Sequence, residues 1–420
     1  MFMRRTLLVL TAVASPMAAQ APHRTVLTHA TVFNGSATWE RNRTIVITDS
    51  MITAIDSGSA PAPDAGDQVI DLGGRFVIPG LIDTHVHLAT DPDSEDSRPR
   101  ELARLKAAIR GGVTSVRDMA GDTRRLGDLA RSAAVTDLPS PDIYYAALFA
   151  GPAFFSDPRT HAASAGAVAG AVPWMRAIDG GTDLRQAVAE ARGTGATAIK
   201  LYAALDSLTV ARVVAEAHRQ GMPVWAHAAL RPAMPRDVAA SGLDAMSHAS
   251  LVARAIAPEE LKALRGSSGL AGAVLQIPSL DSVLQVMATR RIMFDPTLFV
   301  MKEIGGLELA AAVTRRAHQL GVPISTGTDS IAAADTLALP NVHEEIALLV
   351  QSGGFTPAEA LLAATENGAL TLGIFDHVGS LVVGKRADLV VLAADPLKDI
   401  ANTRTVRLVM KRGVVFQREL

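Results

Sequence analysis

The 420-residue sequence contains no cysteine. It therefore has no disulfide, no thiolate metal ligand, no cysteine nucleophile and no cysteine that could carry a lipid. It also lacks an excess of either charge: 40 basic residues stand against 42 acidic ones, with a formal net charge of −2. This balance gives no support to nucleic acid or an anionic membrane as a partner. We therefore expect a small-molecule ligand, and any bound metal must use nitrogen and oxygen donors.

Long apolar runs are missing too. The stretch TLLVLTAVA, residues 6–14, is far shorter than the roughly 20 residues that a membrane helix needs. Two arginines precede it and small residues follow it, so it has the three parts of a secretory signal. We predict a signal peptide at residues 1–21, export to the periplasm or the medium, and no stable membrane anchor after cleavage. The cleavage position stays open, because Pro22 follows the best matching site.

Both ends of the remaining chain carry short β-rich patterns. They occur from residue 25 to about 78 and again at residues 387–394 and 405–417, with Gly and Asn at the turns. Neither group has enough strands to form a core alone. We predict that residues 22–78 and 371–420 together form a small β-sandwich domain.

The middle of the chain, residues 79–370, alternates between apolar runs and helical patterns. The runs end near eight positions: Val86, Val116, Leu148, Leu201, Ala226, Met246, Leu298 and Thr326. Strands that alternate with helices are parallel and joined by crossovers, so this pattern predicts an α/β fold, a (β/α)8 TIM-type barrel. Residues 151–181 form a long connection after one strand, which is typical of a functional lid.

Two histidines stand at the end of the first barrel strand, in LIDTHVHLAT. His85 and His87 point to the same face of a strand and can chelate a metal, although on their own they fit two ordinary hydrogen-bonded histidines equally well. Further polar residues follow other apolar runs. The candidates at the mouth of the barrel are His85, His87, Lys200, His227, His248 and Asp329.

These positions lie in stretches that resemble the metal-dependent amidohydrolase superfamily, within it the exported binuclear branch of prolidase-like and imidazolonepropionase-like proteins. The resemblance covers nearly the whole chain after the signal. The matching stretches are VIPGLIDTHVH, GGVTSVRDM, GATAIKLYA, VWAHA, SHAS, STGTDS, HEEIALLVQSGGFTPAEALLAAT and VGKRADLVVLAADP.

The resemblance implies a site with two divalent metal ions. His85, His87 and Asp329 would hold the first ion, and His227 and His248 the second. Lys200 would bridge them as a carbamate formed with carbon dioxide, since an ammonium group cannot sit beside two dications. Histidine-rich ligation suits zinc, and manganese, cobalt and iron stay possible.

The positions of the candidate residues also suggest roles in catalysis. Asp329 would act as general base and then general acid for a hydroxide that bridges the metals. Tyr202 would bind the oxyanion or a substrate carboxylate, or simply pack at the rim. Arg117 would bind a substrate carboxylate or pair with Asp118, and His161, in the long connection, would contact substrate.

The expected reaction is hydrolysis of an amide or peptide-like C–N bond in a dipeptide or N-acyl amino acid. Within the same superfamily the alternatives are a mononuclear deaminase or cyclic-amidine hydrolase, and a lactonase or esterase. Lys200 argues against the mononuclear class, which lacks the bridging lysine. A protein of a different class, which binds a small molecule without catalysis, would not need Lys200 and Asp329 together. The sequence leaves a homo-oligomer possible.

Overall fold

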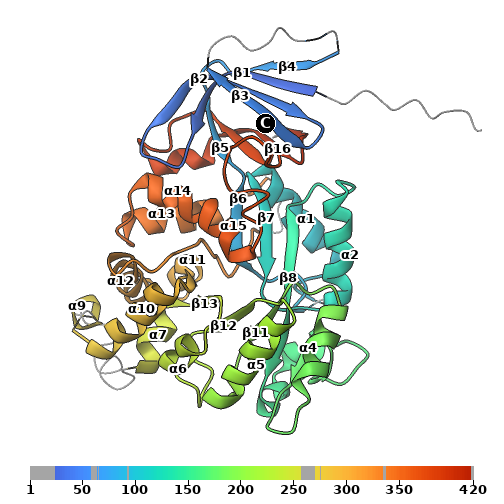
Figure 1. Cartoon of the computed structure of the whole chain (residues 1–420), viewed down its shortest axis with the longest axis vertical. Coiled ribbons are helices and arrows are strands. Elements are labelled where there is room, and N and C mark those ends of the chain that lie inside the picture. The colour runs from blue at the N-terminus through green and yellow to red at the C-terminus, as the bar shows by residue number, and fades with distance from the viewer. Residues whose placement is uncertain are drawn as a thin grey trace, which may run out of the picture.

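The structure, a computed structural model, describes residues 24–57, 64, 66–91, 94–256, 270–274, 276–333 and 337–417. The predicted signal peptide, residues 1–21, lies outside the described residues. Within the described ranges, no helix has the length and apolar character to cross a membrane. Figure 1 shows a sheet built from the first and last strands at one end of the molecule, and the barrel with its helices beneath it.

The two ends of the chain form one β domain, as predicted. Its strands join in the order β17-β16-β15-β5-β1-β2-β3, with β4 beside β1. The antiparallel pair of β5 and β15 links the N-terminal strands to the C-terminal ones. Side chains from both ends, among them Leu27, Ile45, Leu389 and Met410, pack in one apolar cluster. The strands are β1 (Arg24–Phe33), β2 (Trp39–Thr48), β3 (Met51–Ser57), β4 (Gln68–Asp71), β5 (Phe76–Pro79), β15 (Leu389–Leu392), β16 (Val406–Lys411) and β17 (Val414–Gln417).

The middle of the chain forms the predicted parallel α/β barrel. Neighbouring strands pair in parallel from β6 through β7, β8, β11, β12 and β13 to β14. Their ranges are β6 (Leu81–Val86), β7 (Val113–Asp118), β8 (Asp142–Ala150), β11 (Ala198–Leu201), β12 (Val224–His227), β13 (Ala245–Ser247) and β14 (Met293–Asp295).

The eighth predicted strand nearly closes the barrel without forming a regular ladder. Ile324 makes an isolated parallel bridge with Phe294. On the other side, the backbone N–H of Thr84 donates to the carbonyl of Thr326 at 2.8 Å. The segment therefore stands between β14 and β6, where the eighth strand of a barrel belongs.

The seventh strand ends three residues earlier than predicted. β14 ends at Asp295, and the expected end near Leu298 is wrong because Leu298 already begins α11 (Leu298–Glu303). Pro296 lacks the N–H that a ladder needs, and Thr297 has a left-handed φ of 56°. These two residues turn the chain from strand into helix.

Helices cover the barrel where the sequence predicts them. In α5 (Ser207–Arg219), Val210, Val213 and Ala217 recur at helical spacing and are all buried. A capping box of Thr356 and Glu359 begins α14 (Pro357–Ala363). The others are α1 (Arg98–Arg110), α2 (Thr123–Ala134), α4 (Leu184–Gly193), α6 (Pro235–Ala240), α7 (Ala249–Ile256), α9 (Leu270–Val274), α10 (Pro278–Arg290), α12 (Leu307–Gln319), α13 (Val342–Gln351), α15 (Glu366–Leu372) and the 3-10 helix η2 (Ile400–Arg404).

The long connection after β8 is folded rather than irregular. It contains the 3-10 helix η1 (Pro152–Ser156), α3 (Pro158–Ala163), β9 (Ala171–Val172) and β10 (Met175–Ala177). β10 pairs in parallel with the end of β8, opposite Leu148 and Phe149. The connection is thereby fixed beside the mouth of the barrel.

Candidate metal centre

The six predicted donors come from five places at the mouth of the barrel. His85 lies in β6 and His87 directly after it; Lys200 lies in β11 and His227 ends β12. Because the strands are parallel, their carboxyl ends meet at one face, and side chains far apart in the sequence converge there. The two remaining donors, His248 and Asp329, follow β13 and the eighth segment.

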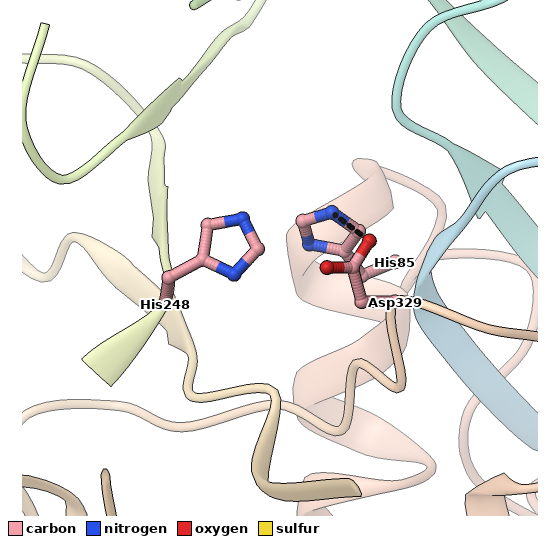
Figure 2. A group of neighbouring side chains, drawn as sticks. All are labelled: His85, His248 and Asp329. Atoms are coloured by element: carbon pink, nitrogen blue, oxygen red, sulfur yellow. Dashed lines mark ion pairs between the residues drawn. The ribbon is translucent and has the colours of Figure 1, made fainter. Parts of the chain in front are cut away.

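Histidine and carboxylate atoms of this group are within a few ångströms of one another. Oδ1 of Asp329 is 3.4 Å from Nε2 of His85 and 3.1 Å from Nε2 of His87. On the opposite side, the Nε2 atoms of His227 and His248 are 3.1 Å apart. Figure 2 shows His85 and Asp329 facing each other, with the ring of His248 directed toward them. Ligand atoms of these three residues lie within 4.8 Å of one another, close enough to share one metal ion.

Lys200 is buried in the same place and has no partner. Its side chain is 1% exposed, and no hydrogen bond within the described structure reaches Nζ. Burial lowers the pKa of Lys200 to about 7, and the positive charge of nearby Arg117 contributes to this decrease. A substantial fraction of this amine is therefore neutral near pH 7, the form that can react with carbon dioxide.

The other donors are also in the unprotonated state that metal binding requires. Burial lowers the pKa of His248 to about 3, and burial together with His248 lowers the pKa of His227 well below its usual value. Both rings are therefore neutral, as a metal ligand must be. Burial alone would raise the pKa of Asp329, but His85 and His87 outweigh it and hold the pKa below its ordinary value. Asp329 is consequently an anion.

Two of the donors are held by unusual backbone geometry. His248 has φ 72° and Asp329 has φ 56°, a left-handed conformation that costs of order 1–3 kcal/mol in a residue other than glycine. A backbone hydrogen bond fixes each strained residue. The N–H of His248 donates to the backbone carbonyl of Asp295 at 3.0 Å, and the N–H of Asp329 donates to the backbone carbonyl of His85 at 2.9 Å. Gly327 makes room nearby, since a Cβ there would lie 2.8 Å from Cβ of His85.

Asp295 is a functional residue that the sequence reasoning missed. Its carboxylate lies 2.8 Å from Nδ1 of His85 and accepts hydrogen bonds from Arg117 at 2.6 Å and from Ser247 at 2.9 Å. An N–H on Nδ1 of His85 leaves Nε2 free for a metal. The sequence does contain a signal for Asp295, because it is an acidic residue at the end of an apolar run and immediately before Pro296.

The structure does not support a substrate contact for Arg117. The side chain is fully buried, stacks over the ring of Trp225 at 4.5 Å, and pairs with Asp295 rather than with Asp118. It lies in the interior of the barrel and is absent from the wall of the cavity described below. Arg117 therefore supports Asp295 instead of binding a ligand.

The structure gives no support to the predicted substrate contact of His161. His161 lies on α3 with its side chain exposed, and it does not line the cavity. Its neighbours Arg159 and Thr160 do. The long connection thus reaches the site, but a single sequence gave no means of telling which face of α3 turns inward.

A cavity of about 420 Å³ opens directly above the donors, a volume that suits a small molecule. Tyr202 forms part of its wall, with its ring 4.1 Å from that of His227 and 4.7 Å from that of Phe154. The lining residues are His87, Thr90, Ala120, Leu148, Phe154, Arg159, Thr160, Met175, Tyr202, His227, His248, Ser250, Leu251, Arg254, Met301, Ile304 and Asp329.

The donor set fits divalent metal ions. It offers neutral imidazoles, an ionised carboxylate and a buried amine without a partner, and the residues of this chain include no thiolate. Asp329 lies beside His85 and His87, and His227 lies beside His248, but His248 is also within reach of His85 and Asp329, so the division of the donors between two ions stays a prediction.

Comparison with known proteins identifies the class. Residues 76–416 match the model of the amidohydrolase family, and the chain belongs to that family. It is 26% identical over 429 residues to ochratoxinase from Aspergillus niger, covering 90% of this chain and 83% of that protein. It is 27% identical over 386 residues to imidazolonepropionase from Micrococcus luteus, covering 83% of this chain and 87% of that protein.

Solved structures agree on the fold. A putative prolidase from Bifidobacterium longum superimposes with a TM-score of 0.70 at 25% identity, over 94% of this chain and 95% of that one. A Xaa-Pro dipeptidase with bound methionine gives a TM-score of 0.75 at 22% identity, over 94% and 100%. Family and relatives together make this protein a hydrolase that acts on carbon–nitrogen bonds, in a family that generally uses divalent metals.

Proposed function

We propose that this protein uses two divalent metal ions, zinc in the first instance, to hydrolyse the amide bond of a dipeptide or an N-acyl amino acid. His85, His87 and Asp329 would hold one ion, and His227 and His248 would hold the other. Lys200, as a carbamate, would supply further oxygen donors. Relatives named prolidase and Xaa-Pro dipeptidase support a dipeptide-like substrate.

The observation that carries this proposal is the state of Lys200. A buried amine with no hydrogen-bond partner is costly, and a protein retains one where the group has another use. Addition of carbon dioxide to the neutral amine yields an anion with two oxygen donors, which suits a place between two cations. A mononuclear deaminase would need no such group at this position.

Bound metals would polarise the scissile carbonyl and lower the pKa of a water molecule at the site. The residues of the chain do the rest. Asp329, ionised and next to His85 and His87, takes a proton from the attacking water and passes it to the leaving nitrogen as the C–N bond breaks. Tyr202, beside His227, donates from its hydroxyl to the oxygen that becomes negative as the water adds.

Replacement of Lys200 tests the proposal with readouts beyond turnover. Metal analysis of the wild type is expected to give two ions per chain, and ¹³C NMR after incubation with labelled bicarbonate is expected to show a carbamate. Lys200→Ala should lose the carbamate signal, one or both ions, and activity. Propionate, a small anion that fits the vacated space, should restore part of the activity.

Other outcomes would favour the alternatives. One ion per chain and an active Lys200→Ala variant would indicate a mononuclear deaminase or cyclic-amidine hydrolase. Turnover of lactones or esters, but of no amide, would indicate a lactonase or esterase. Metal binding without turnover of any amide or ester in a broad panel would indicate a binding protein. Export, which we propose from residues 1–21, is tested separately by fractionating cells that express the full chain.

A further inference from the structure

The cavity above the donors has two walls of different character. The wall formed by β8, the connection after it and the end of β11 carries the aromatic rings of Phe154 and Tyr202, and also Arg159. A second wall is formed by α7 and the end of α11, which follow β13 and β14, and it has no aromatic ring among its described lining residues. The metal-site residues lie between these walls, so a substrate with its scissile carbonyl there extends one end toward each wall.

Charge is distributed unevenly over the lining. Among the described lining residues, the one carboxylate is Asp329, which belongs to the metal centre, and the cationic side chains are Arg159 and Arg254. Away from the donors, the cavity therefore presents positive charge and no negative charge. A substrate with an anionic group would be matched in this space, and a cationic one would be repelled.

The two arginines differ in how far they are already engaged. Arg159 makes two hydrogen bonds to Asp157, at 3.1 Å from Nε and 2.7 Å from Nη2, so an anion of this chain already partly compensates its charge. No hydrogen bond or ion pair among the described residues involves the side chain of Arg254. Its donors are thus available to a ligand, which makes Arg254 the stronger anion anchor of the two.

The position of Arg254 is set by the helix that follows a metal-site residue. α7 begins immediately after His248, and Ser250 and Arg254 are one turn apart, about 6 Å along its axis. Ser250 contacts Sδ of Met301 at 3.0 Å, which fixes α7 against α11. The guanidinium of Arg254 extends to Gly306, where Nη2 lies 3.5 Å from the position of a Cβ.

We infer that Arg254 binds the carboxylate of the substrate's amino-acid part, while the acyl part packs on the aromatic wall of Phe154 and Tyr202. This inference rests on the proposed function and assigns an orientation to it. The leaving amino acid points toward α7, and the acyl group points toward β8 and β11. Tyr202 is then not the carboxylate anchor, and Arg254 is a specificity-determining residue.

A pair of substrates tests the role of the carboxylate. N-benzoyl-L-leucine carries the free carboxylate, and N-benzoyl-L-leucinamide replaces it with a neutral amide; release of benzoate is measured for both. We expect the metal-loaded wild type to prefer the acid. Arg254→Met should raise KM for the acid by about tenfold or more with little change in kcat, and should leave the amide substrate almost unaffected. Arg254→Lys, which keeps the charge, should be intermediate.

Two further variants locate the effect. Arg236→Met, on the exposed surface of α6, controls for loss of a positive charge elsewhere. Arg159→Met tests the other arginine of the cavity. A selective loss of the acid in Arg159→Met, or equal losses of acid and amide in Arg254→Met, would overturn the assignment of Arg254. Turnover of the neutral amide without preference for the acid overturns this inference alone, whereas no turnover of any amide in a broad panel overturns the proposed function as well.

Discussion

The barrel buries charge at both of its ends, and the two ends treat it differently. At the end next to the β domain, the carboxylate of Asp142 forms ion pairs with three side chains. The nitrogen–oxygen distances are 3.0 Å to Lys411, 3.0 Å to Arg386 and 2.7 Å to Arg412. At the mouth, Lys200 is equally buried and has no hydrogen-bond partner in the described structure. The buried charges that connect the two domains form ion pairs with one another, whereas the buried amine without a partner lies where we propose that a ligand completes the site.

The matched cluster also explains how the two domains are joined. Asp142 begins β8 of the barrel, while Lys411 ends β16 of the β domain and Arg412 follows it. Lys411 donates as well to the carbonyl of Ala133 at the end of α2, at 2.7 Å. The cluster is therefore a structural connection between the domains, and changes in it should alter stability rather than chemistry.

The largest expected effect is a loss of activity on replacement of Lys200 that replacement of Lys411 does not cause. Lys200→Met should lower kcat/KM for amide hydrolysis by more than about a thousandfold, because the bridging anion and the metal geometry are lost together. Its stability without metal should be equal to or greater than that of the wild type, since a buried unpaired amine is replaced by an apolar chain of similar length. Activity assays and urea unfolding check the two halves.

Lys411→Met is the matched control for this experiment. It removes a lysine of equal burial from the paired cluster, so stability should fall while kcat/KM of the folded fraction is retained. A loss of activity in Lys411→Met that equals that of Lys200→Met would contradict the distinction between the two clusters.

Asp142→Asn should have the largest effect on stability. It leaves three cations around a neutral amide, and the loss of one partner of a buried charged cluster costs about 3–5 kcal/mol. We expect the free energy of unfolding to fall by that amount, with the metal content of the folded protein unchanged. A decrease below about 1 kcal/mol would show that the cluster is not the connection that its geometry indicates.

A smaller effect is expected at Asp295, which connects the mouth to the barrel interior. Asp295→Asn keeps an oxygen for His85 but removes the negative charge that faces Arg117. Supporting residues of this kind change metal affinity by about 10- to 100-fold, so the metal dissociation constant should rise within that range. Competition with a chelator of known affinity measures it. An unchanged constant would limit Asp295 to a structural role.

The sequence predicts the architecture because the apolar runs and their polar ends follow the strand period. His85 and His87 have one apolar residue between them and fall on one face, as the structure confirms with both rings at Asp329. The eighth segment was recognised by its run, but it is held by single bonds such as Thr84 to Thr326, and its weak pairing cannot be read from residue types.

Contacts between segments that are distant in the chain could not be predicted from the sequence. The pairing of Arg117 with Asp295 joins residues 178 positions apart, and a local reading favours the adjacent Asp118 instead. His161 is exposed because of the orientation of α3, and this orientation depends on how the connection packs on β8. Both features depend on tertiary packing, which residue types and their spacing do not specify.

The last expected effect is a difference between the two ends in how stability depends on pH. Burial raises the pKa of Asp142, but Lys411 and Arg412 outweigh burial and hold this pKa below its ordinary value. The ionised carboxylate therefore stabilises the fold above about pH 4, and this contribution is lost on further acidification. Lys200 acts in the opposite sense in metal-free protein. Its folded pKa is about 7 and its unfolded value about 10.4, so the unfolded chain binds more protons between these values and stability rises with pH. Urea unfolding across this range should show a rise that Lys200→Met lacks and Asp142→Asn keeps, and a rise of equal size in Lys200→Met would refute the assignment to Lys200.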